Sequence, residues 1–482
     1  MKSAWLRISI VFLNVLLVMA GALVAIDQLP FWVQSQDDSG RWHVFALGGS
    51  TTYGDPFDAS PNFTALALRH LGIEDDNEAK LHLFAGPALT LEQNLLKLKD
   101  HLMYRAPKHG VIVLYTGVNE CFREDKTYWM FRYGLHRVPL FYHIVNVWNR
   151  WTKKNLVEGV NSLGVFEAQY REVFRIARRH GYKVITVKPA GNIYDYEPDA
   201  SPWSSVSRRQ VEELLAQGPD AIFDQLPAYR AQGNENFLKF VYAKSLENSG
   251  REAEAHQAYI EAADYHCSYV PNQAKRQVVH NISAENGVTA IDAWTLIESV
   301  SPTGRLDQGA FFDAHHPRLE GVYEISVQVA KQMASVLDRT MEVFPISSVL
   351  SEEFNKKKWN SIWFTRALWY ATNMLKSSTG YADRRALFAS EYLDQYHPED
   401  ERRHQLKKYL EIVISLHRGL CSQAKDRLLA FQGGAQLWSN VFELEGHSQK
   451  MAESTLFYAQ QCRWKPSLLT SLQNLSAQFQ AP

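Results

Sequence analysis

Strand-like and helical segments alternate along the chain from about residue 42 to residue 340, and no other feature of the sequence restricts the fold as strongly. Short apolar runs typical of buried strands are separated by longer stretches whose apolar residues recur at helical spacing. The expected strands are Val44–Leu47, Leu81–Phe84, Val111–Thr116, Lys183–Lys188 and Val288–Ile291, and the clearest helices between them are Leu89–Met103 and Phe166–His180. Such alternation is typical of a parallel sheet with helices on both faces, so we expect an α/β fold.

One connection inside this region is far too long for an ordinary crossover, because it runs from about residue 192 to residue 287. It contains two expected helices, Phe237–Asn248 and Arg251–His266, whose small and aromatic residues sit at the offsets of a tetratricopeptide helix pair. We therefore expect a body over residues 42–340 with a helical insertion at about residues 195–285.

From about residue 345 onward the pattern is entirely helical, which predicts an all-α region over residues 345–482. Trp359, Trp363 and Tyr370 share one helical face, and core packing explains such an aromatic stripe better than a ligand cage. Stacked helix pairs would suit a small tetratricopeptide-like array. The clearest helices are Ser351–Leu375, Ala382–Tyr396, Glu399–Arg418 and Cys421–Phe431.

The first 30 residues have the pattern of an anchoring segment. Lys2 and Arg7 precede an apolar stretch at residues 8–26, and these 19 residues would span roughly 28 Å as a helix. Acidic residues follow the stretch, so the positive-inside rule places the body outside the cytoplasm. A cleaved signal peptide is the alternative, because small residues near its end could mark a cleavage site. We expect a single-pass protein of the cell inner membrane, with its body facing the periplasm or the exterior.

Charge and cysteine content exclude several classes of protein. The 51 Lys and Arg residues nearly balance the 52 Asp and Glu residues, and we find no basic stripe, so no nucleic-acid partner is expected. The spacings of the four cysteines fit no zinc motif and no disulfide scaffold. Cys421 and Cys462, both in the helical tail, could form a disulfide, or could be small buried apolar residues.

Two short motifs carry groups suited to nucleophilic catalysis. Ser50 lies in Gly-Gly-Ser-Thr-Thr-Tyr-Gly directly after the first expected strand, at the sheet edge where α/β proteins bind ligands. A phosphate cradle or a simple turn is the alternative, but the lysine of a phosphate loop is missing. Asp313 and His316 lie three residues apart in Asp-Ala-His-His-Pro. A serine nucleophile, a histidine base and an orienting aspartate would form a hydrolytic triad.

Two further residues between these motifs could stabilise an oxyanion. Asn119 follows the strongly apolar strand at residues 111–116, where its side-chain amide could point at a developing negative charge. A turn residue is the alternative interpretation of Asn119. Gly86 follows the second expected strand and could supply a backbone N–H at the same sheet edge.

The order of these groups resembles the four signature blocks of the SGNH, or GDSL, hydrolases across roughly residues 42–335. Ser50, Gly86, Asn119 and His316 match the Ser, Gly, Asn and His of the blocks. The resemblance implies a flavodoxin-like three-layer sandwich with a parallel sheet. It also implies a catalytic set of Ser50, Asp313 and His316, with an oxyanion hole formed by Ser50, Gly86 and Asn119. The chain departs from the family pattern at Glu120, where an Asp is usual.

These observations predict a serine esterase that cleaves acyl esters through a covalent acyl-serine, with no metal or organic cofactor. The expected export and the resemblance favour acylated envelope glycans as substrates. Two alternatives stay open. The acyl group could be transferred to a sugar hydroxyl, or the protein could be a membrane-tethered scaffold that binds a protein partner through its helical regions and has an inactive hydrolase domain.

Overall fold

A computed structural model describes most of the chain. The described residues are 40–57, 61–73, 78–104, 106–121, 162–195, 208–231, 235–264, 271–354, 356–374, 382–399 and 401–431, together with 459, 462 and 470.

Five strands form one sheet in the order β2-β1-β3-β4-β5, and every neighbouring pair is parallel. The strands are β1 (Trp42–Gly48), β2 (Ala79–Ala85), β3 (Gly110–Tyr115), β4 (Lys183–Lys188) and β5 (Ile291–Asp292). All residues of β3 are buried, which agrees with a strand covered on both faces. This strand order is that of flavodoxin-like folds, so the predicted α/β class is confirmed.

The expected last strand, Val288–Ile291, is wrong in its bounds. The N–H of Val288 donates to the carbonyl of Ser283 at 2.9 Å, which closes the end of the preceding helix. Pairing with β4 begins only at Ile291.

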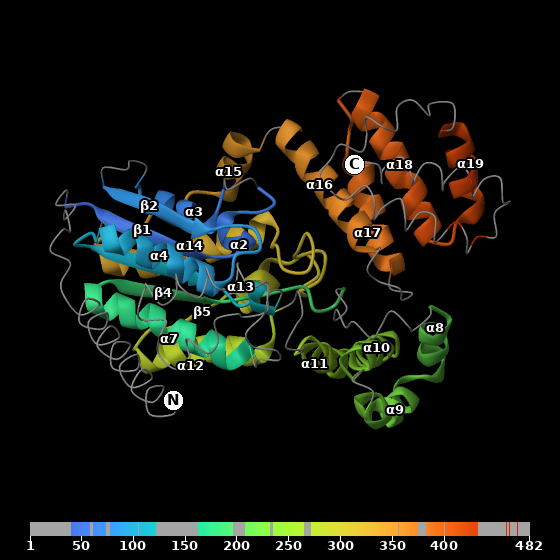
Figure 1. The fold of residues 1–482 in the computed structure, drawn as a ribbon, viewed down its shortest axis with the longest axis horizontal. Coiled ribbons are helices and arrows are strands. Elements are labelled where there is room, and N and C mark those ends of the chain that lie inside the picture. The colour runs from blue at the N-terminus through green and yellow to red at the C-terminus, as the bar shows by residue number, and fades with distance from the viewer. Residues whose placement is uncertain are drawn as a thin grey trace, which may run out of the picture.

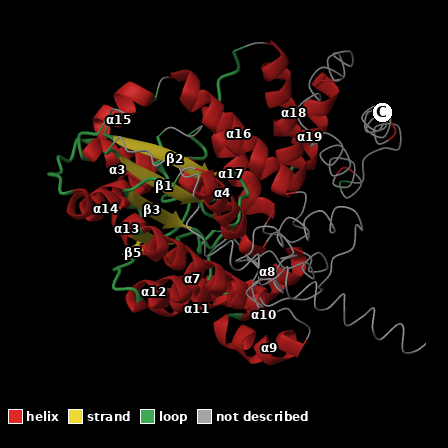
Figure 2. Cartoon of the chain, turned by 60° about the vertical axis from the view of Figure 1, so that its left-hand side comes forward, coloured by secondary structure: helices red, strands yellow, loops and turns green. Residues whose placement is uncertain are grey.

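Helices cover both faces of the sheet, and Figure 2 shows the strands enclosed between them. One face packs through Val44 and Val113 against α3, α13 and α14. The other packs through Phe45 and Ile112 against α4, α7 and α12 (Figure 1). The alternation of inward residues along β1 therefore builds two cores, as expected for a three-layer sandwich. The bounds are α3 (Phe63–His70), α13 (Ala293–Val300), α14 (Leu319–Leu337), α4 (Leu91–Tyr104), α7 (Ser162–His180) and α12 (Gln273–Glu285).

The long connection between β4 and α12 contains α8 (Arg208–Gln217), α9 (Pro219–Ala231), α10 (Glu235–Asn248) and α11 (Glu252–Ala263). The helix pair expected there is present as α10 and α11. Leu246 and Tyr259 are buried in this pair. Its likeness to a tetratricopeptide unit stays a prediction.

The region after α14 is entirely helical within its described residues, as predicted. It contains α15 (Ile346–Glu353), α16 (Lys356–Met374), α17 (Ala382–Gln395), α18 (Glu401–His417) and α19 (Cys421–Phe431). Trp363 stacks on Trp359 and on Tyr392 at ring-centroid distances of 5.2 and 5.6 Å, so the aromatic stripe is a packed core. The single helix expected over residues 351–375 is instead two, because Phe354 adopts an extended conformation and ends α15.

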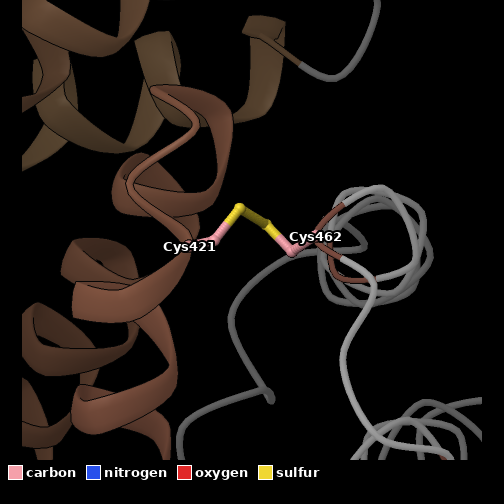
Figure 3. The surroundings of a disulfide bond; sticks show 2 residues. All are labelled: Cys421 and Cys462. Atoms are coloured by element: carbon pink, nitrogen blue, oxygen red, sulfur yellow. A yellow bond between two sulfur atoms is a disulfide. The ribbon is translucent and has the colours of Figure 1, made fainter.

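Cys421 and Cys462 form a disulfide bond, with their Cα atoms 5.6 Å apart (Figure 3). Of the two alternatives left open for these cysteines, the structure shows pairing. The bond links the start of α19 to a residue 41 positions further along the chain.

The predicted localisation as a single-pass membrane protein is contradicted by the structure. Among the helices of the described ranges, none is long and apolar enough to cross a membrane. The longest of them, α7, α14 and α16, have 19 residues each and carry several charged residues, which the hydrocarbon core of a bilayer disfavours. The apolar stretch at residues 8–26 lies outside the described residues.

Candidate active site

Ser50 lies at the carboxyl end of β1, where it is the first residue of the one-turn helix α2 (Ser50–Tyr53). Two hydroxyl groups hold this turn. Thr51 donates to the carbonyl of His315 at 3.2 Å, and Thr52 donates to the carbonyl of Tyr115 at 3.1 Å. Gly48 is required, because a Cβ there would lie 1.9 Å from the Thr52 hydroxyl. The glycine motif thus forms a tight turn that presents Ser50 at the sheet edge.

The loop that carries Asp313 and His316 connects α13 to α14 and is bound to the chain that follows β4. The N–H of Asn192 donates to the carbonyl of Ala314 at 2.8 Å, and the N–H of Ile193 donates to the carbonyl of Leu306 at 3.1 Å. Because β4 is parallel to β1 and β3, its carboxyl end lies at the same edge as Ser50. The sheet therefore brings together side chains that are 266 residues apart in the sequence.

The three side chains predicted to be catalytic are joined by a continuous chain of hydrogen-bond contacts, which we call the relay. The Ser50 Oγ lies 2.7 Å from the His316 Nε2. The His316 Nδ1 lies 2.8 and 2.6 Å from the two carboxylate oxygens of Asp313. All three residues are buried, and Asp313 is completely inaccessible to solvent.

The surroundings of Asp313 determine the direction of the hydrogen bonds. Burial alone would raise the pKa of this carboxyl, but the neighbouring His316 and Arg366 outweigh it and hold the pKa well below its usual range. An ionised carboxylate can only accept, so the His316 Nδ1 must donate to it. In the neutral imidazole the Nε2 is then the acceptor for the Ser50 hydroxyl. This is the tautomer that a general base for Ser50 needs.

Two charged residues beside the relay were missed by the sequence reasoning. Arg366 of α16, only 3% exposed, donates through one nitrogen to Asp313 and through another to Asp55 at 2.8 Å. Asp55 Oδ2 also lies 3.2 Å from the His316 Nε2. Burial raises the pKa of Asp55, but the charges of His316 and Arg366 outweigh it and lower the pKa below its ordinary value.

Signals for both residues exist in the sequence, although neither is decisive. Asp55 directly follows the glycine that ends the Ser50 motif, and Arg366 is an isolated cation in the aromatic stretch of the helix at residues 356–374. Their contact joins positions 311 residues apart, which no local pattern predicts.

Asn119 lies beside Ser50 and borders the same small pocket, which Glu120 and His315 also line. Its Nδ2 donates to the carbonyl of Leu89 at 3.0 Å, which fixes the orientation of the amide. Gly49 keeps room for this amide, because a Cβ there would lie 2.3 Å from the Nδ2. Asn119 therefore lies against the Ser50 turn, and its role as an oxyanion donor stays a prediction.

Gly86 is less closely associated with the pocket. The parallel register pairs Gly48 with Ala85, so Gly86 is next to Gly49 at the same sheet edge. It is not among the residues that line the pocket. Its role as an oxyanion donor stays a prediction.

Glu120 and His315 have clear structural surroundings. Glu120 accepts the N–H of Leu91 at 3.1 Å and so satisfies a donor at the start of α4. Burial raises the pKa of Glu120. Burial, together with the charge of His316, lowers the pKa of His315 to about 3, so its imidazole is neutral at pH 7.

Within the described ranges, one group of potential metal-ligating side chains lies close together: Asp313, His315 and His316, whose ligand atoms are within 4.8 Å of one another. Both ring nitrogens of His316 are already in hydrogen-bond contact with Asp313 and Ser50. Binding a metal would require one of these contacts to break. The group is therefore better suited to proton transfer than to metal binding.

No family model and no curated protein matches the sequence. Solved structures that are similar to this chain include a GDSL-like lipase from Bacteroides thetaiotaomicron and an acetyl xylan esterase. The lipase is 12% identical with a TM-score of 0.30, and the match covers 66% of this chain and 96% of the lipase. The esterase is 13% identical with a TM-score of 0.30, and the match covers 61% of this chain and 98% of the esterase. These values are too low to establish a shared family or activity.

Proposed function

We propose that this protein hydrolyses acyl esters through a covalent intermediate on Ser50. The observation that carries the proposal is the relay in which the Ser50 Oγ, the His316 imidazole and the Asp313 carboxylate are joined at 2.6 to 2.8 Å. Three side chains from two distant segments have the separations and tautomer needed for nucleophilic catalysis.

In the proposed reaction the Ser50 Oγ attacks the ester carbonyl carbon while its proton passes to the His316 Nε2. The carbonyl oxygen becomes an oxyanion, for which the Asn119 amide is the candidate donor, and one such donor contributes about 3 kcal/mol in other hydrolases. The intermediate collapses as the alcohol leaves with the proton from Nε2. Water then attacks the acyl-serine and gives a proton to Nε2. As the bond from the acyl carbon to the Ser50 Oγ breaks, Nε2 returns this proton to Oγ and the carboxylic acid is released.

We further propose that the chain is a member of the SGNH hydrolases. The order of Ser50, Gly86, Asn119 and His316 along the sequence supports this proposal, as does the pairing of Asp313 and His316 on one loop. The parallel sheet with the order β2-β1-β3-β4-β5 is compatible with it. The substrate is proposed only as an acyl ester.

A fluorophosphonate probe and a panel of p-nitrophenyl acyl esters would test the proposed activity. We expect labelling and hydrolysis by the wild-type protein, and loss of both in Ser50→Ala. Thr52→Ser, which keeps the hydroxyl that donates to the carbonyl of Tyr115, is a matched control in the same turn. Equal labelling of wild type and Ser50→Ala would refute the assignment of the nucleophile.

A further inference from the structure

The His316 imidazole is flanked by two carboxylates. Asp313 accepts from Nδ1, and Asp55 lies 3.2 Å from Nε2, the nitrogen that faces Ser50. The catalytic relay as described above uses only the first of these carboxylates. Asp55 is five residues beyond Ser50, directly after Gly54, whose left-handed conformation ends α2 (φ 107°). The turn that presents the nucleophile therefore also places this second carboxylate.

Asp55 can interact favourably with His316 only when Nε2 carries a proton. In the resting relay Nε2 is an acceptor for Ser50, and an ionised carboxylate is also an acceptor, so no hydrogen bond can form between them. Once Ser50 has transferred its proton, Nε2 becomes a charged donor at hydrogen-bond distance from Asp55. An interaction that appears only as the reaction proceeds lowers the barrier and leaves substrate binding unchanged.

Arg366 completes this arrangement from outside the sheet region. Its guanidinium contacts both Asp313 and Asp55, so one positive charge is shared between two negative charges. His315, the other titratable group in contact with His316, is neutral at pH 7. This cluster therefore has an excess negative charge at rest, which proton transfer to His316 cancels. Phe312 also contacts Trp363 and Tyr392 of the helical region, so this region packs directly against the catalytic loop.

We propose that Asp55, held by Arg366 of the helical region, is a further positioning residue that stabilises the protonated His316 during acyl transfer. This inference rests on the proposed hydrolase function. It also makes α16 part of the active site, because the charge that orients both carboxylates comes from that helix.

The test is Asp55→Asn, which removes the charge and keeps the shape of the side chain. We expect kcat to fall about tenfold with KM changed less than twofold. We also expect the pH midpoint of the His316 imidazole, followed by NMR and assigned with His316→Gln, to fall by about one pH unit. A shift of about one pH unit is the lower end of the effect of a nearby opposite charge. We expect the lower end because Arg366 already compensates part of the negative charge of Asp55. Asp55→Glu should restore most of both values.

Asp220→Asn is the matched control, because Asp220 is a carboxylate of α9 whose side chain is 93% exposed. It should change neither readout. An unchanged kcat and an unchanged midpoint in Asp55→Asn would overturn the inference. In that case, loss of turnover in Ser50→Ala would still support the proposed function. The NMR midpoint does not depend on turnover. If it moves in a protein without esterase activity, the contact between Asp55 and His316 is supported and the hydrolase proposal fails.

Discussion

Replacing Arg366 by Met should destabilise the protein, because it leaves a buried carboxylate without its cationic partner. The Arg366 side chain is 3% exposed and that of Asp313 is 0% exposed, so water cannot compensate for the lost contact. Breaking a buried ion pair by removing one partner typically costs about 3 to 5 kcal/mol. Asp313 keeps its bond to His316 and two backbone N–H donors, so we expect a loss near the lower end, about 3 kcal/mol.

An unfolding entropy of about 2.1 cal/mol/K per residue gives a Tm shift of about 1 °C per kcal/mol for a chain of 482 residues, so this loss corresponds to a fall in Tm of about 3 °C. The fall should depend on pH in a defined direction. The folded-state pKa of Asp313 is lowered from its ordinary value of 3.8, so the ionised group contributes stability that is fully present above that value and is lost as the pH falls through the folded-state pKa. In Arg366→Met the pKa of Asp313 should lie closer to its ordinary value. The variant should therefore lose less stability than the wild type as the pH falls.

Thermal unfolding followed by circular dichroism at pH 7 and at pH 3 would measure both effects. The Tm difference between wild type and Arg366→Met should be largest at pH 7 and smaller at pH 3. Arg171→Met is the control, because Arg171 pairs with Glu167 and Glu285 at 46% exposure and should change the Tm little. A fall in Tm below about 1 °C at pH 7, or equal falls at the two pH values, would refute the reasoning.

Two further variants address the oxyanion donor and the helical region. Asn119→Ala should lower kcat by about 10² to 10³ with KM nearly unchanged, since an oxyanion-hole donor acts on the transition state. Steady-state hydrolysis of p-nitrophenyl acetate would measure both constants. A rise in KM alone would argue for a role of Asn119 in substrate binding. Cys462→Ser should reduce the stability of the helical region by about 4 kcal/mol, as loop-closure entropy suggests for a 41-residue separation. Limited proteolysis at increasing urea concentrations would measure this loss of stability. An unchanged urea midpoint for cleavage would contradict the prediction.

Local patterns in the sequence were sufficient to predict the sheet and two of the six helices that cover it, α4 and α7. The strand at Lys183–Lys188 and the helix at Cys421–Phe431 have the predicted bounds, because periodicity and turn residues mark them on both sides. Boundaries were wrong where tertiary contacts decide them. The helix over residues 351–375 is interrupted at Phe354, whose ring packs against Phe57 beside the Ser50 turn.

The sequence by itself determined the chemistry available at the sheet edge. Ser50 in its glycine turn, Asn119 after a buried strand, and Asp313 with His316 on one loop are short-range arrangements that local spacing reveals. Only the tertiary structure decided which charges surround this chemistry. Arg366 reaches Asp313 and Asp55 because α16 packs against the loop that carries Asp313 and His316, and these contacts join residues 53 and 311 positions apart. Electrostatic pairing depends on distance in space and on exclusion of water, and neither is encoded in the spacing of residues along the chain.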